Sequence, residues 1–276
     1  MRPLSKVYTA LIFVILYAPI AVMVLFSFNS INSTGVFAGF STYWYRELFR
    51  DGAALAALKN TLVLAVSSSL IATIIGTVAA VGIFKLKSRA AKSAIMTVTN
   101  IPMMNPDIVT GISMMLLFVF VCVRLAGAAS LSFATVLIAH ITFNLPYVIL
   151  SVMPKLRQMD KHLTEAALDL GCTPLQAFFK VELPSIMPGV VSGLIMAFTL
   201  SLDDFVISYF TTGSGFETLP IRIYSMTKKR VTPDMYALST LIFIAVLALL
   251  VLSNLAGSKS EKKSRAKVPA PTEVTK

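Results

Sequence analysis

Residues 61–84 of the chain read TLVLAVSSSLIATIIGTVAAVGIF and contain no Asp, Glu, Lys or Arg. A helix needs about 20 apolar residues to cross the hydrocarbon core of a bilayer, so this stretch is long enough to span a membrane. The composition of the 276-residue chain agrees, because 56% of it is apolar, only 13% is charged, and its mean hydropathy is +0.80. An ordinary soluble domain carries about twice that charged fraction. We therefore predict an all-α, polytopic membrane protein.

Further apolar stretches predict more spans. The first stretch follows Arg2 and Lys6, and we interpret it as an uncleaved anchor because it lacks a clear small-x-small cleavage site. The apolar stretch 93–106 holds two prolines and is expected to be an irregular, partly inserted segment before the third span. The predicted transmembrane domain, residues 1–256, has six spans at 7–28, 61–84, 107–124, 130–153, 185–205 and 235–256, with a loop at 154–184 and a basic tail at 257–276.

The net charge of +11 comes from basic residues that lie between the spans, which favours membrane topology over nucleic-acid binding as its explanation. With both termini inside, 16 of the 24 Lys and Arg lie in inner segments, so we expect both termini in the cytoplasm. The cluster Lys228, Lys229 and Arg230 then lies outside, and nothing in the sequence explains it. The tail is expected to be solvated, with contact to anionic lipid as the alternative.

The loop reads QMDKHLTEAALDLGCTPLQAFFKVELP over residues 158–184 and predicts a helix–turn–helix. Asp160 is placed to cap the first helix, and Gly171 is placed to end it in the left-handed conformation. A capping box opens the second helix through Thr173, Pro174 and Gln176.

Apolar side chains recur at helical spacing on both predicted loop helices. Two short helices must bury such faces under their own bundle or in a groove on a soluble partner, and the spacing leaves both possibilities open. The residues concerned are Leu163, Ala166, Ala167 and Leu170 on the first helix, and Leu175, Phe178 and Phe179 on the second.

The residues Glu165-Ala166-Ala167, then Gly171, then Val181-Glu-Leu183-Pro184 resemble the EAA loop of permease subunits in ABC importers, which usually has Ile at the position of Val181. The resemblance implies a type I permease fold whose coupling helix docks in a cleft of a cytoplasmic ATPase. It implies that Ala166 and Ala167 permit close approach and that Glu165 pairs with a basic group of the ATPase. The coupling residues it implies are Glu165, Ala166, Ala167, Asp169, Gly171, Leu183 and Pro184.

Nearly the whole chain resembles the permease subunits of spermidine/putrescine ABC importers of the PotC type, and permeases for putrescine alone share much of the pattern. This resemblance implies a subunit of the bacterial inner membrane, with a second homologous permease, an ATPase dimer and an extracytoplasmic polyamine-binding protein as partners. ATP and Mg would be used by the ATPase and not bound by this chain. The matching segments are Phe40–Tyr45, Asn105–Gly111, His140–Phe143, Glu165–Gly171 and Phe198–Asp204.

Three carboxylates lie in or beside the predicted spans, where a charge costs on the order of 3 kcal/mol. An extended polyamine cation needs carboxylates interleaved with aromatic surface, whereas an anion path would need Arg, Lys or helix N-termini. Two alternatives stay open: Asp107 stabilises the N-terminus of its helix, and Asp203 and Asp204 lie at the outer interface. The candidate path residues are Asp107, Asp203, Asp204, Phe205 and Tyr209, and the helix break at Asn105-Pro106 is expected to line a cavity there.

Several functions are excluded or disfavoured by what the sequence lacks. It has no phosphate-binding loop, so this chain is not expected to hydrolyse ATP, and it has no nucleophile–base constellation of an enzyme. His140 and His162 are too few and too far apart for a metal site, and His140 is expected to be a hydrogen-bonded interior group. A permease for another small solute and an ATP-independent secondary transporter or channel stay as alternatives.

Overall fold

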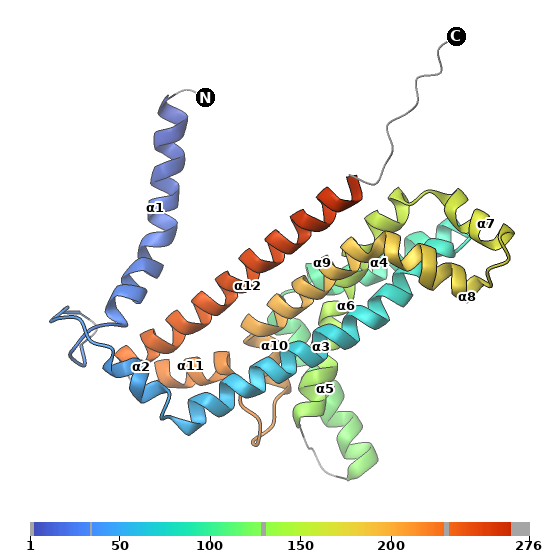
Figure 1. Cartoon of the computed structure of the whole chain (residues 1–276). Helices are drawn as coiled ribbons and strands as arrows, with labels where there is room; N and C mark the ends of the chain where they lie inside the picture. The colour runs from blue at the N-terminus through green and yellow to red at the C-terminus, as the bar shows by residue number, and fades with distance from the viewer. Residues whose placement is uncertain (1–2, 34, 128–130, 229–231, 266–276) are drawn as a thin grey trace. The chain divides into compact units, whose positions relative to one another are not determined.

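The computed structural model describes residues 3–33, 35–127, 131–228 and 232–265, and regular structure in this part is helical, with one isolated bridge between Asn29 and Phe40 (Figure 1). Lys229 and Arg230 of the basic cluster and residues 266–276 of the predicted tail lie outside the described residues. The helices are α1 Pro3–Phe26, α2 Tyr43–Leu48, α3 Gly52–Lys85, α4 Arg89–Met104, α5 Asp107–Ala126, α6 Phe133–Gln158, α7 Lys161–Asp169, α8 Pro174–Ala177, the π-helical turn η1 Phe178–Glu182, α9 Leu183–Asp203, α10 Val206–Thr211, α11 Leu219–Thr227 and α12 Pro233–Arg265.

Each predicted span overlaps one long helix, namely α1, α3, α5, α6, α9 or α12, although 7–28 and 185–205 extend past the ends of α1 and α9 and residue 130 lies outside the described residues. Among the described residues, five helices are long and apolar enough to cross a membrane, and they correspond to α1, α3, α5, α6 and α9 but not to α12. The apolar part of α12 that is described in full, Pro233–Ala248, is shorter than a span. The fold is thus that of an all-α polytopic membrane protein.

The chain forms two compact units, and α3 and α12 run from one unit into the other. The first unit comprises Met1–Asn60 and Glu217–Ala248. Its small apolar core joins α2, α3, α11 and α12 through Leu48, Ala54, Ala57, Leu219 and Leu238.

The second unit contains Thr61–Phe216, and its core is the contact between α6 and α9. Small residues recur every fourth position of α9 and are buried: Gly189, Gly193, Ala197 and Ser201. A Cβ atom added to Gly189 would lie 2.9 Å from the Ser151 carbonyl oxygen of α6. Such a stripe lets two backbones approach closely, which is a common basis of helix association in lipid. The sequence analysis did not identify this stripe.

The prediction of two separate short helices in the loop is wrong for the second one. α8, η1 and α9 follow one another without a break, so that Pro174–Asp203 is one helical run of 30 residues. The π-helical turn ends at Glu182, two residues before Pro184. A proline has no amide to donate and its ring crowds the carbonyl group four residues earlier, and the wider turn relieves this crowding without ending the helix.

The prediction of an irregular segment at 93–106 is also wrong, because α4 is regular from Arg89 to Met104 and contains Pro102. Its Ser88 cap accepts a hydrogen bond from the Ala91 amide. The backbone leaves the helical conformation only at Asn105 and Pro106, directly before α5 begins at Asp107. The first proline is tolerated inside the helix, and the second ends it because proline disfavours a helical residue before it.

The close α6–α9 contact predicts a position-specific response to one added methyl group. Gly189→Ala should lower the stability of the protein by about 1–3 kcal/mol, because the Cβ meets backbone atoms that cannot move aside. In Gly82→Ala of α3 the Cβ meets no atom of the described residues within 4 Å, so this control should melt at or slightly above the wild-type temperature. The measurement is thermal unfolding in detergent, and equal midpoints for the two variants would contradict the close packing.

Candidate functional site

The loop between α6 and α9 has the local structure that its sequence predicts. The Asp160 carboxylate accepts a hydrogen bond from the His162 amide at 3.0 Å and caps α7. At the other end Gly171 has φ +85°, a conformation that residues with a side chain rarely adopt. The amides of Gly171 and Cys172 donate back to the carbonyl oxygens of Leu168 and Ala167 at 2.9 and 3.0 Å. This pair of hydrogen bonds completes a Schellman motif and stops the helix.

The capping box of α8 is present as predicted. The Gln176 amide donates to the Thr173 hydroxyl at 3.3 Å, and the Thr173 amide donates to the Gln176 side-chain oxygen at 3.1 Å. The turn between α7 and α8 is therefore fixed by hydrogen bonds on both sides, so the two helices hold a defined angle to each other.

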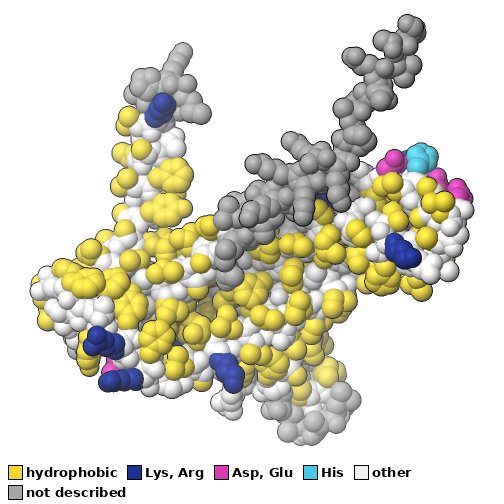
Figure 2. Space-filling model, viewed as in Figure 1, with side chains coloured by type: hydrophobic (Ala, Val, Ile, Leu, Met, Phe, Trp, Pro, Cys, Tyr) yellow, Lys and Arg dark blue, Asp and Glu magenta, His cyan; other side chains and the backbone are white. Residues whose placement is uncertain are grey.

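The described residues of this chain leave most of the large apolar side chains of the loop uncovered. Ala167 is buried, whereas Leu170 is 85% exposed, and Leu163, Leu168, Leu175 and Phe179 are exposed as well. Acidic side chains and a histidine gather over α7 in the same region (Figure 2), where the His162 ring contacts Glu165 at 3.1 Å. An exposed apolar face with an acidic rim is typical of a surface that binds another protein.

The other residues of the predicted coupling motif divide into exposed and packed ones. Glu165, Ala166, Asp169 and Gly171 are exposed on the loop, and Pro184 is exposed at the start of α9. Leu183 is half-buried and packs against the α6–α9 core. The structure therefore brings Glu165 to Gly171 together on one surface, with Leu183 beneath it.

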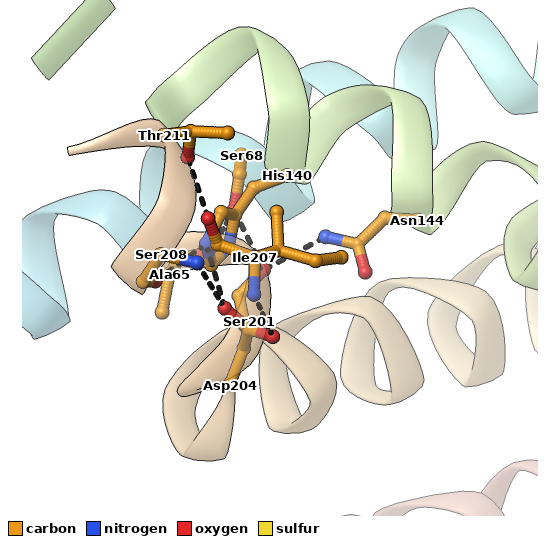
Figure 3. A network of polar contacts seen from close by, with 9 residues as sticks. All are labelled: Ala65, Ser68, His140, Asn144, Ser201, Asp204, Ile207, Ser208 and Thr211. Atoms are coloured by element: carbon orange, nitrogen blue, oxygen red, sulfur yellow. Dashed lines mark hydrogen bonds and ion pairs between the residues drawn. The ribbon is translucent and has the colours of Figure 1, made fainter. Parts of the chain in front are cut away.

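A network of buried polar side chains joins four helices deep in the second unit (Figure 3). His140 of α6 is 1% exposed, as the sequence analysis expected of an interior group. Its Nδ1 atom lies 3.2 Å from the Ser201 hydroxyl of α9, and its Nε2 atom lies 2.9 Å from the Ser208 hydroxyl of α10. Ser201 also contacts Ser68 of α3 at 2.9 Å and accepts a hydrogen bond from Asn144 of α6 at 2.8 Å. The network fixes α3, α6, α9 and α10 relative to one another.

The two adjacent carboxylates at the end of α9 have different surroundings. The Asp204 side chain is only 9% exposed and accepts hydrogen bonds from the amides of Ile207 and Ser208 at 3.3 and 2.8 Å. Its Oδ2 atom lies 3.4 Å from Nε2 of His140, which is an ion pair when the ring is protonated. Asp203 is exposed. In this structure Asp204 therefore holds α10 to α6, and Asp203 is the exposed carboxylate of the two.

The remaining candidate path residues lie on two packed helices. Asp107 is exposed in the first turn of α5, and α5 packs on α10. Gly111, one turn after Asp107, approaches Phe210 so closely that an added Cβ would lie 3.0 Å from its ring. On α10, Tyr209 is exposed, and its ring lies 5.3 Å from that of Phe205. Asp107 and Tyr209 are thus exposed on two helices that pack on each other, and Asp203 and Phe205 lie at the junction of α9 and α10.

Sequence reasoning missed most partners of His140. His140 and Asn144 are four residues apart and therefore on one face of a helix, which is a signal that the sequence contains. Ser68, Ser201 and Ser208 give no such signal, because buried serines in an apolar helix look the same as serines bonded to their own backbone. The Asn144 amide oxygen is buried and has no hydrogen-bond partner within the described part of the chain.

Comparisons with known proteins give matches over most of the chain. A family model described as binding-protein-dependent transport system inner membrane component matches residues 72–263. The putrescine transport system permease protein PotI of Escherichia coli strain K12 is 42% identical over 85% of this chain and 83% of its own length. The spermidine/putrescine transport system permease protein PotC of the same strain is 37% identical over 92% of this chain and 94% of its own length.

Solved structures share the fold at low sequence identity. A crystal structure of a bacterial ABC transporter involved in the import of the acidic polysaccharide alginate has a chain that superimposes with a TM-score of 0.71 at 15% identity, covering 92% of this chain and 94% of that one. The MetNI methionine ABC transporter in an inward-facing conformation gives a TM-score of 0.59 at 19% identity, covering 80% and 99%.

The apolar helices and these superpositions define a polytopic membrane protein with the fold of ABC importer permeases. The chain belongs to the family of binding-protein-dependent transport system inner membrane components. It is therefore a non-enzymatic transport subunit of the inner membrane.

The buried network predicts that His140 stabilises the fold. His140→Ala should lower stability by about 2–4 kcal/mol, because the Asp204 carboxylate and two serine hydroxyls lose a buried partner and a cavity forms. His162→Ala is the matched control, because the His162 side chain is exposed. The free energy of unfolding of this variant should lie within about 0.5 kcal/mol of the wild-type value. Thermal unfolding in detergent measures both, and a wild-type midpoint for His140→Ala would show that the network adds little.

Proposed function

We propose that this permease imports polyamines, spermidine or putrescine, across the inner membrane. The observation that carries the proposal is the identity of 42% and 37% to permeases named for putrescine and for spermidine/putrescine, over more than four-fifths of each chain. The chemistry of the exposed side chains supports it, because Asp107 and Asp203 are acidic and lie with Phe205 and Tyr209 near the α5–α10 contact. Carboxylates attract the ammonium groups, and aromatic rings favour cations through their faces.

In this proposal Asp203 and Asp107 meet the passing cation, and the helix break at Asn105-Pro106 lines the same path. Asp204 takes part indirectly, because its carboxylate is bound to α10 and faces His140. The cation can compete with His140 for this carboxylate when the helices separate, which would loosen α10 from α6 during translocation.

The loop is the proposed contact to the ATPase. Its exposed apolar side chains and the acidic Glu165 and Asp169 fit a groove that is apolar in the middle and basic at the rim. Ala166 and Ala167 let the backbone of α7 approach the groove closely. ATP and Mg act on the ATPase, and closure of the ATPase dimer pushes α7 and rocks the helices that follow it.

The proposed assembly has this chain beside a second, homologous permease, above an ATPase dimer and below an extracytoplasmic polyamine-binding protein. Both termini lie in the cytoplasm, which follows from the excess of Lys and Arg in the inner segments. Residues 1–256 form the proposed transmembrane domain. The basic segment after it is proposed to be solvated, with contact to anionic lipid headgroups as the alternative and no role for nucleic acid. Its residues 257–265 continue α12 as a helix, which the sequence analysis did not predict.

The proposed docking predicts that the end of α7 controls recovery of the ATPase. Gly171→Val forces a β-branched residue into φ +85°, which costs about 1–2 kcal/mol and redirects the turn, so the co-purified ATPase should fall about tenfold. Gly127→Val is the control, because Gly127 also has positive φ, at +71°, but ends α5 instead of α7. Undiminished recovery with Gly171→Val would count against the docking role.

The proposed cation path predicts a charge effect at the exposed carboxylate. Asp203→Asn should reduce uptake of radiolabelled putrescine and spermidine into proteoliposomes about tenfold, because an ammonium group loses one charged partner. Glu47→Gln removes an exposed carboxylate of α2 and serves as the control. Uptake kinetics equal to wild type for Asp203→Asn would remove Asp203 from the path, and absence of uptake by the wild-type complex would refute the polyamine proposal.

A further inference from the structure

One buried carboxylate lies between the exposed loop and the helical bundle. Glu182, the last residue of η1, is 2% exposed, although it is charged and only two residues away from exposed Lys180. Its Oε1 atom accepts hydrogen bonds from Lys85 Nζ at 2.9 Å and from the Thr164 hydroxyl at 3.3 Å. Its Oε2 atom is buried and has no hydrogen-bond partner in the described part of the chain.

The partners of Glu182 come from elements that are far apart in the sequence. Lys85 is the last residue of α3, and Thr164 lies on α7 directly before Glu165. Glu182 itself directly precedes α9, and the turn η1 packs against α7, α8 and α9. One carboxylate oxygen therefore links the loop to the inner ends of two predicted spans.

Of the two lysines Lys85 and Lys92 near this end of α3, Lys85 is the one that pairs with Glu182. Lys92, the nearby basic residue of α4, donates to the Phe84 carbonyl oxygen at 3.2 Å and lies over the Phe84 ring, so Lys85 is the cation that pairs with Glu182. A buried carboxylate that loses its cation keeps its desolvation cost, so the folded protein strongly favours arrangements in which Lys85 and Glu182 stay together. Lys85 is 54% exposed on its side chain, so its stem can follow a moving loop while its ammonium group keeps the contact.

We propose that Glu182 is a positioning residue for energy coupling, which joins α7 to the end of α3 and the start of α9. A displacement of α7 then moves both spans together through this carboxylate. The inference rests on the proposed docking of an ATPase on α7. It adds the contacts through which a displacement of α7 would move α3 and α9. The peptide chain alone connects α7 to α9 through the turn at residues 170–173, and it gives no direct connection from α7 to α3.

The test uses the complete transporter in proteoliposomes, with the external binding protein loaded with radiolabelled putrescine. The central variant is Glu182→Met, which replaces the carboxylate by an apolar side chain of similar volume. It removes the buried charge itself, and the remaining partner Lys85 is 54% exposed and stays solvated. We expect a wild-type melting temperature, wild-type recovery of the ATPase and continuing ATP hydrolysis. Import per ATP hydrolysed should fall about tenfold, which corresponds to the loss of a charged hydrogen bond.

Three further variants separate coupling from folding. Glu182→Gln keeps an acceptor for Lys85 and Thr164 and should restore part of the import per ATP. The double variant Lys85→Met with Glu182→Met replaces the whole pair by apolar side chains, which is often neutral or stabilising for folding, and should reduce this ratio as Glu182→Met does. Lys87→Met, which removes an exposed lysine just after α3, should leave it unchanged. An unchanged ratio in Glu182→Met overturns the inference, and so does loss of the ATPase or of the fold in this variant, because Glu182 would then serve docking or folding. Failure of wild-type docking or uptake would refute the proposed function instead.

Discussion

The close contact of α9 with α6 is the constraint on which the rest of the described second unit depends. Gly189, Gly193 and Ala197 remove the side-chain volume that would separate the two helices, and Ser201 continues the same stripe with a polar group. Because lipid offers little hydrophobic driving force between helices, such a contact gains stability from dispersion and from hydrogen bonds made at short range. His140 reaches Ser201 only because the stripe brings the two backbones together. The polar network thus depends on Gly189, Gly193 and Ala197, whose side chains carry no polar atoms.

The contrast between Asp203 and Asp204 shows why a pair of charges cannot be assigned from its sequence alone. The two residues are adjacent aspartates, yet their surroundings differ. Asp203 is exposed, whereas the Asp204 side chain is only 9% exposed and accepts hydrogen bonds from two backbone amides. The difference arises where α9 ends: Asp204 leaves the helical conformation with ψ 123°, so its carboxylate lies at the start of α10. There it can accept from the unpaired first amides of that short helix. A charge at this position is a structural element as well as a candidate for the substrate path.

The parts of the fold that sequence reasoning predicted are those with short-range causes. Uncharged length predicted the long helices, and cap chemistry predicted the ends of α7 and the start of α8, because Asp160, Gly171 and Thr173 act on amides a few residues away. The continuity of α8 with α9 was missed because a proline such as Pro184 usually marks a helix boundary in a sequence. The structure keeps the helix continuous through the π-helical turn η1, which the sequence does not indicate. The small-residue stripe of α9 was missed although its four-residue spacing is present in the sequence, and that spacing alone does not say which helix packs on it. The serine partners of His140 and the Lys85–Glu182 pair were missed because each joins residues that are distant in the sequence, and a single sequence holds no record of such pairs.

The helical run Pro174–Asp203 connects the exposed loop with the buried network without an intervening loop. Its 30 residues at 1.5 Å each correspond to a length of about 45 Å. Its first turn holds the capping box, and its last turn holds Ser201 and Asp203. A helix of this length is stiff except where its hydrogen-bond ladder is interrupted, and this one is interrupted near η1 and Pro188. Bending at η1 would absorb a displacement of the loop before it reached the bundle. The Lys85–Glu182 pair lies at the end of that turn, and in the proposed coupling it opposes this bending, so that the helical run moves as one element.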